Sequence, residues 1–501
     1  MRRRMSLLFV LLLGVLVAGC SANNDNESSD DWAPDAPSAV ESKAEDPIAM
    51  APQPSVPSDM FFQDYGTNPY VSTEEDKLST FAMDVDTGSY TLAKSYIQNG
   101  NLPPQEAIRL EEFINYFDLN DAPPKNDTFA IHVDAGPSPF GTEGTQLVRI
   151  GIKGKEIGSE ERKRANLTFV IDVSGSMNQD DRIGLVKRSL ALLVNQLKDD
   201  DRIGIVVYGS KARTVLEPTA VEEEEVILKA IDELQIEGST NAEAGLLLGY
   251  KLASKTYDKE AINRVILCSD GVANVGETDS EGILRTIEDY AGQNLYLSTF
   301  GFGMDNYNDV LMEQLADKGN GAYAYIDDID EAKKIFQEQL TGTLQTIAKD
   351  AKIQVEFDPA QVKGYRLLGY ENRAIADEDF RNNHVDGGEV GAGHSVTALY
   401  EIQLKDNASK HWGTVTIRYK DVDNNNRSRE SEASIGPSGE LSDKTLFIAA
   451  VAEFAKIMKD SEGVGTSRIQ KVLQMAEKHA SSEQQEEFGE LIKRFMEISK
   501  K

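Results

Sequence analysis

The chain has 501 residues, of which 40% are hydrophobic and 27% charged, and its 84 acidic and 52 basic residues give a net charge of −32. This composition is that of a globular protein long enough for about three domains. Binding to nucleic acid depends on Lys and Arg that neutralise phosphates, so this large acidic excess argues against nucleic acid as a partner. With only two cysteines, the chain is not a disulfide-stabilised scaffold.

The first twenty residues have the order of a bacterial export signal. Three arginines at 2–4 precede an apolar run over 7–17, which is too short to span a bilayer permanently. The next residues, Val17-Ala18-Gly19-Cys20, resemble a lipobox, in which the cysteine is diacylated and becomes the new N-terminus. We expect residues 1–19 to be a lipoprotein signal peptide and Cys20 to carry the lipid that holds the protein on a membrane. Ordinary secretion with cleavage after a small residue is the alternative.

Residues 20–60 are rich in Ser, Asn, Asp, Glu, Ala and Pro, and contain six of the sixteen prolines of the chain. Such a composition does not bury enough apolar surface to fold, which predicts a disordered tether. Removal of residues 1–19 takes away three arginines and no acid. The mature chain therefore has 49 basic and 84 acidic residues, a net charge of −35.

Residues 61–160 have the pattern of an N-terminal α+β region. From about Ser79 the sequence predicts a strand and a helix, then a Pro-Pro break and a second amphipathic helix over 105–117. Two later stretches, TFAIHVDAGPSPF and TQLVRIGIKGKEI, alternate apolar and polar residues with the period of half-exposed strands.

Between residues 166 and 347 short apolar runs alternate with helical patterns. The runs are LTFVIDV, RIGIVVYG, ARTVLEP, NRVILCSD, LYLSTFGFG and AYAYID, and helices such as Arg182–Lys198 lie between most of them. This alternation predicts an α/β unit with a doubly wound parallel sheet and helices on both faces. Because ARTVLEP follows RIGIVVYG after only a short turn, we expect it to be an antiparallel edge strand.

After residue 347 the two-residue period returns. The stretches KIQVEFDP, VKGYRLLGYE, SVTALYEIQL and GTVTIRYKD predict antiparallel strands in a β-rich region over 348–440. A helical region follows over 441–501, with helices expected at Lys444–Met458 and Ser467–Ser499. We expect the strands before and after the α/β unit to form one β-sandwich into which that unit is inserted.

Side chains with oxygen atoms gather where strands of the predicted α/β unit end. Asp172, Ser174 and Ser176 follow the first strand at alternate positions, Asp270 ends the strand NRVILCSD, and Thr240 lies in a loop before a helix. The carboxyl ends of parallel strands share one edge of the sheet, where ligands of this architecture bind. Two carboxylates and three hydroxyls suit a hard divalent cation such as Mg²⁺, Mn²⁺ or Ca²⁺. With so few acids around it, the cation stays electron-poor and can accept a carboxylate from another molecule.

A structural role is the alternative for these residues, with the three hydroxyls capping turns or helices and Asp270 capping a strand end. All three loops in this order, however, resemble the metal-ion-dependent adhesion site (MIDAS) of the von Willebrand factor type A (vWA) domain, and the five-residue motif is complete. The resemblance covers residues 166–347 and implies a Rossmann-like fold and cation-dependent protein binding. The flanks LSTFAMDVDTGSY and LPPQEAIRLEEFINYF are similar to those of bacterial YfbK-type lipoproteins.

The triplet Asp86-Thr87-Gly88 has the residues found in aspartic proteases. Those enzymes need two such aspartates facing each other, and the chain has no second Asp-Thr-Gly. We therefore expect this segment to be a turn that precedes a helix.

Two further features are expected to be structural. Four residues fall at positions 1, 3, 5 and 12 of a calcium loop, namely Asp421, Asp423, Asn425 and Glu432. Asn426 stands where such a loop needs glycine, which favours a hairpin loop instead. Cys268 lies in an apolar run and predicts a buried thiol.

These patterns together predict a non-enzymatic lipoprotein of the cell membrane or envelope, lipid-anchored on the extracytoplasmic face. Its ligand is expected to be a protein that presents Asp or Glu to the site-bound cation, with Mg²⁺ as the first choice and Mn²⁺ or Ca²⁺ as alternatives. The other hypothesis is a structural or assembly scaffold of the envelope in which the metal is only structural. The five histidines have neither HExxH nor triad spacing, and no Gly-rich phosphate loop occurs, so an enzyme is without support.

Overall fold

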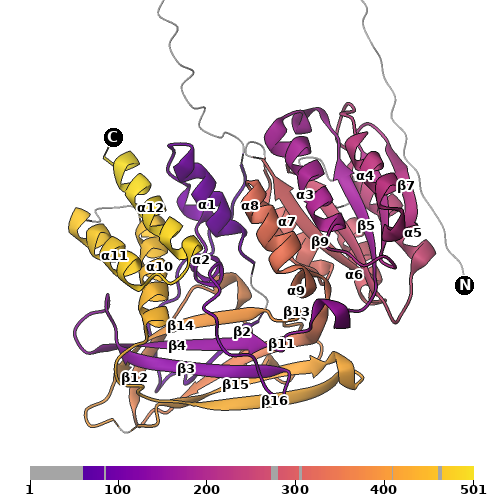
Figure 1. Cartoon of the computed structure of the whole chain (residues 1–501). Coiled ribbons are helices and arrows are strands. Elements are labelled where there is room, and N and C mark those ends of the chain that lie inside the picture. Colours follow the sequence, from indigo (N-terminus) through magenta and orange to yellow (C-terminus); the bar gives the residue numbers. More distant parts are fainter. Residues whose placement is uncertain are drawn as a thin grey trace, which may run out of the picture. The chain divides into compact units, whose positions relative to one another are not determined.

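The structure, a computed structural model, describes residues 60–83, 86–271, 280–303, 307–408, 410–460 and 465–500. The predicted signal peptide, Cys20 and the predicted tether up to residue 59 lie outside these ranges. The described residues contain three β-sheets and the helices that cover them (Figure 1).

The central sheet carries the predicted α/β unit. Its strands are, in spatial order, β10 (Tyr323–Ile326), β9 (Tyr296–Phe302), β8 (Ile262–Ser269), β5 (Ala165–Asp172), β6 (Arg202–Tyr208) and β7 (Ala212–Ala220). All neighbouring pairs are parallel except β6 and β7. The doubly wound sheet is therefore confirmed, and so is the prediction that ARTVLEP forms an antiparallel edge strand.

The helices cover the sheets and form a group at the C-terminal end of the chain. They are α1 (Gly88–Gln98), α2 (Leu110–Asn115), α3 (Leu185–Val194), α4 (Glu224–Asp232), α5 (Ala242–Ala253), α6 (Ser280–Ala291), α7 (Asp309–Lys318), α8 (Ile329–Lys333), α9 (Leu340–Leu344), α10 (Asp443–Asp460), α11 (Thr466–His479) and α12 (Glu483–Ile498). Among the described residues, no helix combines the length and the apolar character needed to cross a membrane.

Helices lie on both faces of the central sheet because alternate residues of a buried strand point in opposite directions. Phe169 and Ile171 of β5 pack in a core with Leu190 of α3. Val170, between them, packs in a second core with Leu246 of α5. Helices α3 and α5 accordingly lie on opposite sides of β5 in Figure 1.

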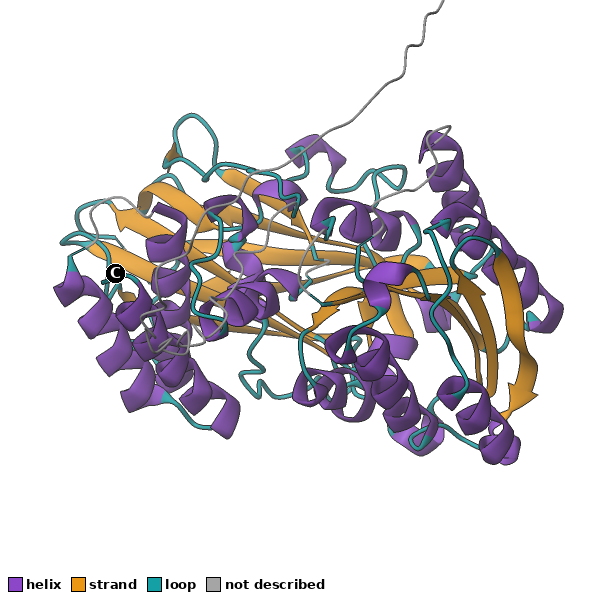
Figure 2. Cartoon of the chain, turned by 90° about the horizontal axis from the view of Figure 1, so that it is seen from above, coloured by secondary structure: helices purple, strands orange, loops and turns teal. Residues whose placement is uncertain are grey.

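Two further sheets combine strands from before and after the α/β unit. One has the order β1 (Val71–Ser72), β12 (Val362–Leu368), β14 (Ser395–Leu404), β4 (Thr145–Gly154), β3 (Phe129–Pro137). The other has the order β13 (Val390–Gly391), β11 (Thr346–Phe357), β15 (Gly413–Asp421), β16 (Arg427–Ile435), and β2 (Leu78–Ala82) pairs with β11. Because β4 pairs with β14 and β2 with β11, the α/β unit is inserted between β-rich segments, as predicted (Figure 2 shows the strands in orange).

The N-terminal and C-terminal helices share one apolar core. The ring of Phe117 lies 5.2 Å from that of Phe447 in α10 and 5.5 Å from that of Phe488 in α12. These rings meet edge to face, a favourable arrangement for aromatic pairs. The C-terminal helical region is thus packed against the segment that precedes the α/β unit.

Three predicted helices have different limits in the structure. The prediction over 105–117 is wrong in its first half, because the backbone N–H of Arg109 donates to Ser89 Oγ and only α2 is α-helical. The stretch Ser467–Ser499 is helical as predicted, and it is divided into α11 and α12 where the Ser482 side chain caps the start of α12. The helix Arg182–Lys198 is reduced to α3, which a π-helical turn over Asp180–Gly184 precedes.

Candidate functional site

Three loops meet at the carboxyl edge of the central sheet. Asp172 ends β5, and Asp270 directly follows β8, the parallel neighbour of β5. The loop that carries Thr240 is bonded to the loop after Asp172 by two backbone hydrogen bonds, from Gly175 N to Gly238 O at 2.9 Å and from Glu237 N to Val173 O at 2.6 Å. The sheet order therefore brings segments almost one hundred residues apart to the same edge.

Hydrogen bonds link four of the five predicted ligands. The N–H of Ser174 donates to Asp172 Oδ1 (2.8 Å), the hydroxyls of Ser174 and Ser176 lie 2.9 Å apart, and Ser176 Oγ donates to Asp270 Oδ1 (3.1 Å). Asp172, Ser174 and Asp270 are buried, whereas Ser176 is exposed. For Thr240 the structure brings the loop to this edge and leaves the side chain half-buried.

Local sequence explains the path of the Thr240 loop. Gly238 has a positive φ of 52°, and a Cβ there would lie 2.1 Å from Ser210 Oγ, which favours glycine at this position. Three residues later the Asn241 side chain accepts from the N–H of Ala244 and starts α5. Thr240 is thereby held between a tight turn and a helix N-terminus.

Both carboxylates of the site have raised pKa values. Burial raises the pKa of Asp172. Burial and the neighbouring Asp172 raise the pKa of Asp270 to about 6. A cation bound between them would favour the charged forms of both groups.

Arg182 is a residue of this site that the sequence pattern does not single out. Its guanidinium Nη1 lies 2.8 Å from Asp270 Oδ2 and donates to the backbone oxygen of Ser176, also at 2.8 Å. A basic residue at the start of an amphipathic helix is usually exposed, but Arg182 is only 4% exposed. No signal in the sequence reveals a partner 88 residues away.

The donor set fits a hard divalent cation. All predicted ligands are carboxylate or hydroxyl oxygens, the type that Mg²⁺, Mn²⁺ and Ca²⁺ prefer. The guanidinium beside Asp270 is itself a positive group at this position. In the described ranges no cluster of three or more His, Cys, Asp and Glu side chains is arranged to hold a metal, so a cation here would depend on hydroxyl and water oxygens.

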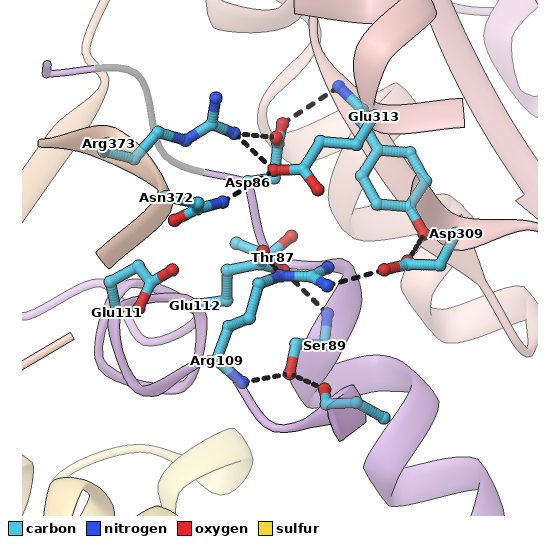
Figure 3. Close-up of polar contacts among 12 residues, drawn as sticks. Asp86, Thr87, Ser89, Arg109, Glu111, Glu112, Asp309, Glu313, Asn372 and Arg373 are labelled. Carbon is cyan, nitrogen blue, oxygen red and sulfur yellow. Dashed lines mark hydrogen bonds and ion pairs between the residues drawn. The ribbon is translucent and has the colours of Figure 1, made fainter. Parts of the chain in front are cut away.

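A second polar cluster, drawn in Figure 3, is buried and consists of residues outside these three loops. Arg373 contacts Asp86 Oδ2 and Glu313 Oε1, each at 2.8 Å. Arg109 contacts Asp309 Oδ2 at 2.6 Å and also pairs with Glu112. These residues come from the N-terminal segment, from α7 of the α/β unit and from the segment after it, so the cluster joins all three parts.

Asp86 of the Asp-Thr-Gly triplet belongs to this cluster. Its Oδ1 accepts from the N–H of Tyr323 at 3.0 Å, and α1 begins two residues later at Gly88. Sequence reasoning found the turn before a helix but missed the buried ion pair, because Arg373 lies 287 residues away.

Two structural predictions outside the site are confirmed. β15 and β16 form an antiparallel hairpin whose turn contains Asn425 and Asn426, both with positive φ. Asp421 of that loop pairs with Arg429 at 3.1 Å. Cys268 is fully buried, and burial raises the pKa of its thiol.

Family profiles match three consecutive stretches of the chain. A von Willebrand factor profile matches residues 56–149, the von Willebrand factor type A domain profile matches residues 166–338, and the profile for the C-terminal part of the uncharacterized protein YfbK matches residues 342–498.

Individual proteins resemble the chain over different lengths. The uncharacterized protein YfbK of Escherichia coli (strain K12) is 36% identical over 460 residues, which cover 86% of this chain and 80% of that protein. The uncharacterized protein sll0103 of Synechocystis is 31% identical over 229 residues, which cover 46% of this chain and 52% of that protein. The solved von Willebrand factor type A protein from Catenulispora acidiphila aligns with 75% of this chain and 91% of its own, at 16% identity and a TM-score of 0.45.

The residues matched by the vWA profile include the sheet that carries Asp172 and Asp270. Domains of this type commonly mediate protein–protein interactions and commonly bind a divalent cation at a MIDAS. Because the similarity to the E. coli protein extends over most of both sequences, this chain belongs to the YfbK family of vWA-domain proteins.

Proposed function

We propose that this protein is a cell-envelope lipoprotein that captures an acidic residue of a protein partner through a divalent cation at Asp172, Ser174, Ser176, Thr240 and Asp270. The observation that carries the proposal is the bonded set of oxygens at the carboxyl edge of the sheet, from Asp172 to Asp270. The cation, Mg²⁺ in the first place, would supply an open coordination position. Asp172 and Asp270 supply the negative charge for the cation, and the hydrogen bonds among the predicted ligands keep the loops together.

Because of the negative net charge of the mature chain, an acidic partner can be attracted only close to the bound cation. At −35 the surface repels acidic partners at long range, so attraction has to arise where a dication offsets the field. Higher salt would screen the repulsion and is expected to speed association with an acidic partner. Removal of the metal is expected to abolish the complex.

We also propose that Cys20 anchors the mature chain to the extracytoplasmic face of a membrane. The support is the sequence Val17-Ala18-Gly19-Cys20 after a short apolar run. Cys20→Ser is expected to release the protein from the membrane fraction or to leave an unprocessed precursor, as measured by fractionation and mass spectrometry. A processed variant that stays membrane-bound would refute the anchor.

A second candidate function is an assembly scaffold, in which the metal only stabilises the domain. It is favoured by the core that the N-terminal and C-terminal helices share and by the buried ion pairs that join the three parts. In that case partner binding would use the sandwich or the terminal helices. Chelation separates the two functions, because it should break the first kind of complex and leave the second intact.

The decisive experiment is a pull-down from envelope extract with and without EDTA. Wild type with Mg²⁺ should retain a partner that Asp172→Ala loses. Thr240→Ala is the matched variant that keeps the net charge, and it should lose affinity for the partner while its melting temperature changes little. A partner that binds equally well in EDTA, or whose binding survives replacement of its carboxylates by amides, would support the scaffold instead.

A further inference from the structure

Arg182 is an arginine held inside the candidate cation site. Its Nη1 donates both to Asp270 Oδ2 and to the backbone oxygen of Ser176. The other oxygen of the same carboxylate, Oδ1, accepts from the hydroxyl of Ser176. The guanidinium is therefore part of the bonded set that contains the predicted ligands.

The fold leaves room for this arginine and fixes its position. Gly303, at the end of β9, has a positive φ of 77°, and a Cβ there would lie 2.5 Å from Arg182 Cγ and Nε. Arg182 itself comes from the π-helical turn before α3. The position of the guanidinium is thus defined by the turn before α3, by Gly303 and by the loops of Ser176 and Asp270. Arg182 is therefore part of the architecture of the site.

The charge of the site depends on whether Arg182 is counted. Asp172 and Asp270 contribute two negative charges, which alone would neutralise a dication. Taken together, Asp172, Asp270, the Arg182 guanidinium and a bound dication carry one net positive charge. Like charges that share one buried carboxylate repel each other, and a remaining positive charge attracts an anion.

We propose that Arg182 is a counter-cation of the candidate site, which lowers the affinity for a divalent cation and leaves the loaded site positive for an incoming carboxylate. This inference rests on the proposed function, because it concerns the same cation. A purely structural clamp would act in the opposite direction: its removal would loosen the loops and weaken metal binding.

The test is titration of the full chain in detergent with Mn²⁺ alone by calorimetry, so that no partner is needed. Arg182→Gln keeps a hydrogen-bond donor but removes the charge, and Arg182→Met is a second neutral variant. Both should bind Mn²⁺ about tenfold or more tightly than wild type. Arg182→Lys retains the charge and should stay within about threefold. Arg188→Gln, at an exposed position of α3, changes the net charge equally and should leave the affinity unaltered.

Each other outcome has a separate meaning. Wild-type binding of Mn²⁺ with equal or weaker binding by the folded neutral variants would overturn the role of Arg182 and leave the proposed function standing. Weaker binding by the neutral and the lysine variants alike would identify a structural clamp. Absence of Mn²⁺ binding in wild type and in every folded variant would overturn the inference and the proposed function together. Circular dichroism and melting curves establish which variants are folded.

Discussion

Glu111 is a carboxylate with almost no access to solvent. It is 2% exposed, and its Oε2 accepts from the N–H of Tyr370 at 3.0 Å. Burial, followed by the neighbouring charge of Glu112, raises its pKa from 4.5 to about 7. Between these two pH values the folded protein holds a proton that the unfolded chain releases. The contribution of Glu111 to stability is therefore fully present below about pH 4.5 and is lost as the pH rises through 7.

The variant Glu111→Gln imitates the protonated form and is predicted to be more stable than wild type at pH 8. A shift of this size corresponds to about 3 kcal/mol in the free energy of unfolding, and the gain should fade towards pH 5. Urea unfolding at pH 5, 6, 7 and 8 measures it. Glu490→Gln, on the exposed surface of α12, is the control and should change the free energy of unfolding by less than about 1 kcal/mol. A constant difference between Glu111→Gln and wild type at all four pH values would contradict the prediction.

Single residues differ in how far they were predictable. The proximity of four predicted ligands was predictable from their positions at strand ends, because sheet topology decides which strand ends meet. These residues are Asp172, Ser174, Ser176 and Asp270. Arg182 and Arg373 were not predictable, since their acidic partners lie 88 and 287 residues away in the sequence. Nothing in local composition distinguishes a buried arginine of this kind from an exposed one.

Helix α5 lies unusually close to the central sheet. A Cβ on Gly249 would lie 2.3 Å from Cγ2 of Val170 in β5, and one on Gly245 would lie 2.6 Å from the ring of Tyr208. Two glycines four residues apart thus form the contact face of the helix. The same helix begins just after Thr240, so its position also determines where that loop lies.

We predict that Gly249→Val lowers the free energy of unfolding by about 2 kcal/mol, because the buried Val170 has no space to yield. Leu247→Val places the same residue on the same helix at a position that is 45% exposed, and should cost less than about 0.5 kcal/mol. Equal losses in the two variants, measured by denaturant unfolding, would show that close packing of α5 is not the cause.

Among the elements, strand types were predicted better than helix limits. The edge strand β7 followed from the shortness of the turn before it. The helix expected over 105–117 failed because Ser89, from another segment, binds the backbone of Arg109. Such a tertiary bond has no local signal, whereas Ser482 is a capping residue that the local sequence contains.

For the whole molecule, the insertion of the α/β unit between β-rich segments was predictable from the return of the two-residue period after residue 347. The pairing of β4 with β14 and of β2 with β11 agrees with it. The buried ion pairs that connect the parts were not predictable from the sequence. They imply that the described parts unfold together. Arg373 is central, because it contacts Asp86 before the unit and Glu313 within it.

Arg373→Met is predicted to lower the free energy of unfolding by about 3–5 kcal/mol, because it removes the guanidinium that contacts two carboxylates, each 4% exposed. Arg381→Met removes an arginine that is 64% exposed and should cost less than about 1 kcal/mol. If the buried charge is the cause, adding Glu313→Gln to Arg373→Met should restore part of the loss, whereas a packing defect would leave the double variant no better than the single one. Thermal and urea unfolding of the four proteins provide the comparison.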